Sequence, residues 1–133
     1  MALPQKIIDE MTTRRRDFHK HPERGWTEFR TTSICADVLE RLGWSVRFAD
    51  EFIEPERVMG REVDAAAEKR RALEQGAPAD TLARIGEYTG LCAELRCGCG
   101  PLTVIRFDID CVETAESDVP SHRPAALGFA SVN

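Results

Sequence analysis

The chain has 133 residues, of which 42% are hydrophobic and 31% charged, a length and balance that suit one globular domain. Its formal net charge of −5 gives no support for nucleic-acid binding, which depends on basic surfaces. The N-terminal stretch lacks the apolar core of a signal peptide, and no window approaches the ~18 apolar residues of a membrane span. We therefore expect a cytoplasmic protein with no membrane partner. Its five cysteines should stay reduced in that compartment.

The chain is predicted to begin with a helix over residues 4–20. Pro4 suits the first turn of a helix, and apolar residues follow at spacings of about three, four and seven that place them near one face. The helix should end before Pro22, because a residue that precedes proline avoids the helical region.

A second helix is predicted over residues 27–42, where Ile34, Val38 and Leu42 recur along one face. We expect Thr27 to cap its first turn and Gly43 to end it in a left-handed conformation.

A strand is predicted over residues 44–48, where apolar and polar residues alternate. Residues 53–88 are charged and rich in alanine, with Gly76 and Pro78 as breaks, and predict a helical insertion between two strands. Further strands are expected over 91–96, which alternates, and over 102–107, which is nearly all apolar, as in a strand covered on both faces. Helices followed by strands predict an α/β fold of layered type.

Residues 113–133 show neither strand nor helix periodicity. A structureless stretch of about 20 residues is unusual in a compact domain. We interpret it as a segment whose packing partners lie in a longer chain.

Asp108 and Asp110 close the most hydrophobic predicted strand. Alternation would place both carboxylates on one face, at the strand end where α/β sheets gather their ligands and where carboxylates bind cations. The alternative is that acidic residues merely end a buried strand where it meets water, and the pattern alone favours this alternative.

Cysteine and histidine spacings offer weaker candidates. Cys97 and Cys99 give at most half of a zinc site, since a structural zinc needs four ligands. His19 and His21 would point to different faces of a helix, so we predict packed or hydrogen-bonded side chains and no pair of metal ligands. His122 stands in the tail without a partner that could tune it as a base.

Seven stretches in order carry a recognisable combination of motifs: Arg15–Glu23, Trp26–Thr31, the insertion around Gly60–Val63, Thr89–Leu91, Gly100–Val104, the Arg-x-Asp-x-Asp element Arg106–Asp110 and the tail Ser121–Ser131. Together they resemble the aminoacylase-like amidohydrolases, whose members include aminobenzoyl-glutamate hydrolases, auxin-conjugate hydrolases and hippurate hydrolase. The insertion and the tail narrow the resemblance to the aminobenzoyl-glutamate hydrolase branch.

The resemblance implies that residues 1–133 are the N-terminal part of a catalytic domain, with the rest of that domain and a dimerisation domain absent. It implies hydrolysis of N-acyl or N-aroyl amino acids, such as aminobenzoyl-glutamate or indole-acetyl-aspartate, in a homo- or hetero-oligomer. The family uses zinc or manganese to activate water. Its Cys-Gly-His and Glu-Glu ligands are missing here, so we expect neither a bound metal nor activity for this chain alone.

For the site, the resemblance implies a supporting place near the metal centre for Asp108 and Asp110, and a candidate substrate-side place for His122. Two other hypotheses stay open. The chain could be a truncated homologue that acts as a non-catalytic binding or assembly module, with an open sheet edge. A thiol-based redox or zinc module built on Cys97 and Cys99 is the weaker of the two.

Overall fold

The computed structural model describes residues 3–112 and residue 119. The chain divides into two units, and the larger of them is Glu23–Cys111. The other unit contains the first helix, α1 (Gln5–Lys20), which confirms the helix predicted over 4–20. The backbone N–H of His21 closes α1 by donating to the carbonyls of Asp17 and Phe18, directly before Pro22.

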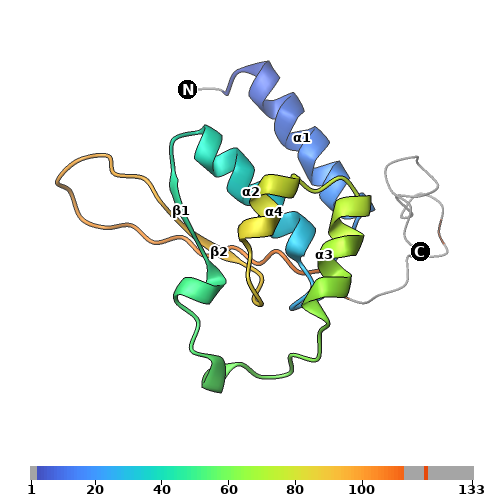
Figure 1. Cartoon of the computed structure of the whole chain (residues 1–133). Helices are drawn as coiled ribbons and strands as arrows, with labels where there is room; N and C mark the ends of the chain where they lie inside the picture. The colour runs from blue at the N-terminus through green and yellow to red at the C-terminus, as the bar shows by residue number, and fades with distance from the viewer. Residues whose placement is uncertain (1–2, 113–118, 120–133) are drawn as a thin grey trace. The chain divides into compact units, whose positions relative to one another are not determined.

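The larger unit combines helices with one small sheet (Figure 1). Each helix and strand predicted before residue 95 has a counterpart, although most begin or end a residue or more inside the predicted bounds. In chain order the elements are α2 (Phe29–Arg41), β1 (Ser45–Phe48), the short 3₁₀ turns Ala49–Glu51 and Pro55–Arg57, α3 (Ala65–Glu74), α4 (Ala79–Arg84) and β2 (Leu91–Glu94).

Strands β1 and β2 pair antiparallel, with Val46 opposite Ala93 and Phe48 opposite Leu91. The chain between them therefore leaves the sheet and returns to it, and α3 and α4 lie in this excursion. Both residues predicted to interrupt the insertion lie between its helices: Gly76 has a φ of +84° just after α3, and Pro78 immediately precedes α4. Gly43 ends α2 with a φ of +86°, as predicted.

The core of the larger unit lies where α2 packs against α3, α4 and β1. Small side chains let the helices approach closely, and Phe29, at 0% exposure, is the largest of the fully buried side chains. The buried apolar residues are Phe29, Ala36, Phe48, Ala65, Ala72, Ala77, Leu82 and Ile85.

The prediction of a strand over residues 102–107 is wrong: the segment runs as an extended stretch of coil and is part of no described sheet (Figure 1). Its large apolar side chains are exposed, with Leu102 at 85%, Val104 at 82% and Phe107 at 78%. A strand buried on both faces needs neighbours on its edges and layers above and below it. Within the described residues the sheet contains β1 and β2 alone, so the α/β class is confirmed only as mixed helix and small antiparallel sheet.

Among the helices that the structure describes, none combines the length and the apolar character needed to cross a bilayer.

Candidate functional site

The carboxylate of Glu23 lies at the beginning of α2 and its side chain is fully buried, at 0% exposure. Its two oxygens accept hydrogen bonds from the backbone N–H groups of Arg30, at 3.0 Å, and Thr31, at 2.7 Å. These N–H groups belong to the first turn of α2, which has no partners for them within the helix. A negative charge there is also favoured by the helix dipole.

The prediction that Thr27 caps α2 is therefore wrong. The Thr27 hydroxyl donates to the carbonyl of Arg24 at 2.9 Å, and α2 begins two residues later, at Phe29. A carboxylate from outside the helix takes the place that a local hydroxyl was expected to fill.

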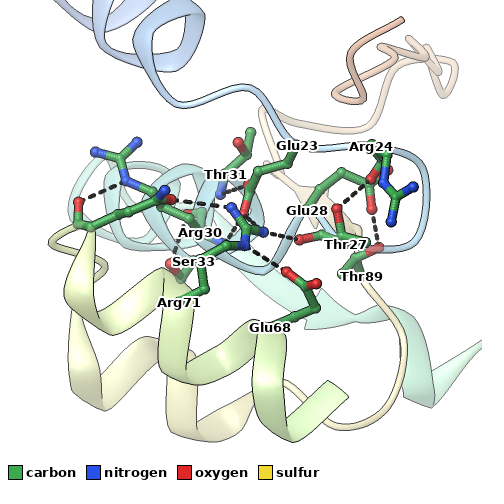
Figure 2. A network of polar contacts seen from close by, with 11 residues as sticks. Glu23, Arg24, Thr27, Glu28, Arg30, Thr31, Ser33, Glu68, Arg71 and Thr89 are labelled. Carbon is green, nitrogen blue, oxygen red and sulfur yellow. Dashed lines mark hydrogen bonds and ion pairs between the residues drawn. The ribbon is translucent and has the colours of Figure 1, made fainter. Parts of the chain in front are cut away.

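Arg71 joins this carboxylate to the insertion (Figure 2). From α3, its guanidinium donates to Glu23 at 2.9 Å, to the carbonyl of Thr27 at 3.0 Å and to Glu68 at 2.6 Å. Burial alone would lower the pKa of Arg71, but the hydrogen bonds and charges of Glu68 and Glu23 outweigh it and raise that pKa. Arg71 is thus a permanent cation that connects α3 to the loop before α2.

Glu28 forms a second buried acidic position in the same loop. Its carboxylate accepts a hydrogen bond from the hydroxyl of Thr89, just before β2. Burial raises the pKa of Glu28, and the negative charges of Asp110 and Glu23 add to the increase, against the opposing hydrogen bond from Thr89. Glu28 therefore holds its proton more strongly in the folded protein than in the unfolded chain.

The Arg-x-Asp-x-Asp segment lies beside this loop. The backbone N–H of Cys111 donates to the carbonyl of Glu23 at 2.7 Å, and the neighbouring Asp110 acts electrostatically on Glu28. Asp108 instead forms an exposed ion pair with Arg106. The structure thus brings Asp110, and not Asp108, together with the buried acids, and the alternation that was to align the two aspartates is absent because no strand forms.

The other candidates of the sequence lie apart. His21 closes α1, where its Nδ1 is 3.0 Å from the Asp17 carbonyl and 3.4 Å from the Asp17 carboxylate, which confirms a hydrogen-bonded helix end. None of the five cysteines, all of which the structure describes, forms a disulfide, and both Cys97 and Cys99 are exposed. His122 lies outside the described residues.

The described residues do not fit a metal ion. No group of three or more histidine, cysteine, aspartate or glutamate side chains in this part of the chain is arranged to hold one. The acids that do cluster have other partners: Glu23 bonds two backbone N–H groups and Arg71, and Glu28 bonds Thr89. What this arrangement can do is fix the loop before α2 against α3 and β2.

The raised pKa of Glu28 predicts how Glu28→Gln changes stability with pH. A carboxyl whose pKa is higher in the folded than in the unfolded state adds stability that is fully present below the unfolded value, near 4.5, and is lost as pH rises through the folded value. Glutamine can still accept the Thr89 hydrogen bond but does not titrate. The stability of the native protein relative to Glu28→Gln should therefore fall from pH 4.5 to pH 8, measured by urea unfolding.

Glu40→Gln is the matched control for this prediction. The hydrogen bond from Arg84 lowers the pKa of Glu40, so its contribution is present above its ordinary value and is lost as pH falls. Between pH 4.5 and pH 8 the Glu40→Gln difference should therefore stay nearly constant, because the contribution of Glu40 is already complete above pH 4.5 and is lost only below it. A Glu28→Gln difference that stays flat or rises with pH would contradict the assignment.

Comparison with known proteins finds no matching family model, but it finds close relatives. The chain is 41% identical, over 90% of its length, to a p-aminobenzoyl-glutamate hydrolase subunit of Escherichia coli (strain K12). It is 38% identical, over 97% of its length, to indole-3-acetyl-aspartic acid hydrolase of Enterobacter agglomerans. The chain spans 28% and 30% of the lengths of these two relatives.

A solved structure agrees with them. The crystal structure of an aminobenzoyl-glutamate utilization protein from Klebsiella pneumoniae matches 67% of this chain and 23% of its own, with a TM-score of 0.62 and 39% identity. The resemblance inferred from the motifs is thereby confirmed. The chain is homologous to one segment of the longer proteins in the aminobenzoyl-glutamate hydrolase group of amidohydrolases.

Proposed function

We propose that the chain supplies part of the catalytic domain of an amidohydrolase that cleaves the amide bond of N-acyl or N-aroyl amino acids. The observation that carries the proposal is the 41% identity, over 90% of the chain, to a protein named for p-aminobenzoyl-glutamate hydrolysis. Another relative, 38% identical, is named for indole-3-acetyl-aspartic acid. Both names join an aromatic acyl group to an acidic amino acid, and we infer that substrate class.

In this proposal the described residues act as a scaffold. Glu23 and Arg71 hold the loop before α2, and the N–H of Cys111 attaches the acidic segment to that loop. Asp110 is thereby held near Glu28, and we propose a supporting, positioning role for Asp108 and Asp110 at the edge of the catalytic centre. The zinc or manganese ion expected from the family finds no fitting ligand set among the described residues, so we derive no reaction step through it.

The direct test is a chimera in which this chain replaces the 123 matched residues of the Escherichia coli relative. We expect the chimera to hydrolyse p-aminobenzoyl-glutamate. Asp110→Asn in the chimera should lower kcat by about 10- to 100-fold if Asp110 positions catalytic groups. Glu62→Gln, at an exposed position in the insertion, should leave kcat unchanged.

Two further measurements make the test decisive. A chimera that is folded by circular dichroism yet hydrolyses neither p-aminobenzoyl-glutamate nor indole-3-acetyl-aspartate would overturn the proposal. The unmodified 133-residue chain should show no turnover and well under one equivalent of zinc or manganese after incubation with the ion and gel filtration. About two bound equivalents, with hydrolysis that a chelator abolishes, would show that the ligands lie within this chain.

A second candidate function has one specific observation in its favour. The apolar segment Leu102–Phe107 is exposed, although such segments normally have partners. A non-catalytic role as a binding or assembly module would make use of that surface. The chimera separates the two candidates, since only the first requires catalytic activity.

A further inference from the structure

The segment Leu102–Phe107 is the largest concentration of exposed apolar side chains in the described part of the larger unit. Leu102, Val104, Ile105 and Phe107 are 85%, 82%, 69% and 78% exposed. The six residues contain no glycine or proline and a single charge, that of Arg106. Sequences of this kind favour pairing as strands, and an exposed one is a site of association.

The backbone of the segment is also open to pairing. It is extended and takes part in no described sheet, so its N–H and C=O groups offer an edge to another strand. One end is anchored, because the N–H of Cys111 donates to the carbonyl of Glu23. A partner strand would therefore meet a segment that is held at one end and does not need to order from a random coil.

We propose that two copies of this chain associate by antiparallel pairing of residues 103–111 around Phe107. In this register Phe107 lies opposite its own counterpart, and Ile105 of each copy lies opposite Ile109 of the other. Arg106 of each copy lies opposite Asp108 of the other. Cross-strand apolar pairs and opposite charges both stabilise such a ladder. The exposed ion pair that Arg106 and Asp108 form within one chain is replaced by two pairs between chains.

Charge complementarity selects this register among its neighbours. Centring the pair on Arg106 places two arginines opposite each other, and centring it on Asp108 or Ile109 places aspartates opposite each other. Centring it on Ile105 places Arg106 opposite Val104 and Asp108 opposite Leu102, so neither has a charge partner, whereas pairing about Phe107 leaves only Asp110, opposite Val104, without one. Like charges directly opposite are destabilising, so only pairing about Phe107 gives opposite charges and avoids like ones.

The inference does not depend on the proposed hydrolase function. Its test is the mass of the full 133-residue chain in solution, by light scattering and analytical ultracentrifugation across a dilution series. We expect a dimer. Arg106→Asp and Asp108→Arg should each weaken dimerisation by about tenfold, since two attractive pairs become repulsive. The double exchange Arg106→Asp with Asp108→Arg should restore it.

Arg96→Asp is the matched control. Arg96 also forms an exposed ion pair with an acid two residues away, Glu94, but lies outside the proposed ladder. Its replacement should leave the dimer unchanged. Circular dichroism of each variant shows that the fold is retained.

An independent measurement uses Phe107→Cys, which places a thiol at the centre of the ladder. Mild oxidation should give a disulfide between the two copies of residue 107, identified by peptide mass mapping, and Leu102→Cys should not link to itself. A wild-type chain that stays monomeric at all concentrations would overturn the proposal and leave the surface to a different partner, such as the remaining part of a longer relative. Association that the double exchange does not restore would equally overturn it, as non-specific apolar contact.

Discussion

Replacing Glu23 with alanine is expected to lower the free energy of unfolding by about 3 kcal/mol or more, one of the two largest single-residue effects in the larger unit. The substitution leaves two backbone N–H groups at the beginning of α2 without their acceptor, and a buried N–H group that lacks an acceptor lowers the stability of the folded state. It also removes a carboxylate from the Arg71 guanidinium; breaking a fully buried ion pair from one side costs about 3–5 kcal/mol, and the 31% exposure of Arg71 lowers that cost here. Urea unfolding followed by circular dichroism measures the change.

Glu68→Ala is the control for this prediction. Glu68 also bonds Arg71, at 2.6 Å, but its side chain is 24% exposed and the Arg30 and Thr31 N–H groups of α2 bond Glu23 instead. Its loss should cost about 1 kcal/mol or less, as for a pair near the surface. If Glu23→Ala unfolds the chain completely, Glu23→Gln, which keeps one acceptor oxygen, should give an intermediate stability. Equal losses in the free energy of unfolding for Glu23→Ala and Glu68→Ala would show that the hydrogen bonds from Glu23 to the first turn of α2 add no measurable stability.

Local periodicity was sufficient to predict most of the secondary structure. The spacing of Ile34, Val38 and Leu42 predicted α2, and alternation predicted β1 and β2. These signals work because they are repeated within a single element and depend only on which of its faces is buried. Gly43 and Gly76 were informative because each adopts a positive φ next to a helix end, a conformation that favours glycine and that depends only on the local backbone.

The cap from Glu23 could not be predicted in this way. Its carboxylate reaches α2 only because the chain bends between them at Trp26, which adopts a φ of +70° that is uncommon for a large residue. Contacts far along the chain accompany that bend: the Trp26 indole N–H donates to the carbonyl of Met59 at 3.2 Å, and its ring meets Tyr88 edge-on at 6.2 Å. No local spacing encodes contacts with residues so distant in the sequence.

The segment Leu102–Phe107 shows a different limit. Its composition correctly indicates a strong tendency to pair as a strand, but whether a strand forms depends on which neighbours are present. With no described neighbour on its edges, the segment is extended and exposed, and the two aspartates after it have different surroundings. The partnership of Asp110 with Glu28 was therefore missed, although Glu28 itself had a recognisable place before the helix.

Phe29→Ala is expected to destabilise the larger unit by about 3–5 kcal/mol, as is usual when a fully buried phenylalanine is truncated. Phe29 is 0% exposed, belongs to the core between α2 and the insertion, and begins α2 directly next to the residues that Glu23 caps. The ammonium of Lys69, from α3, lies 5.6 Å from the centre of its ring, so the truncation also removes a cation–π contact across the core.

Phe52→Ala provides the comparison for Phe29→Ala, because it deletes the same ring from a position that is 45% exposed. That ring also lies near a cation, since the Arg47 guanidinium is 6.0 Å from its centre, so the two variants differ mainly in burial. We expect a loss of about 1 kcal/mol or less for Phe52→Ala, with the urea dependence of unfolding unchanged in both. A Phe29→Ala loss as small as that of Phe52→Ala would mean that the helices do not close over this ring. The scaffold that holds Glu23, Arg71 and Asp110 in place would then lack its main apolar support.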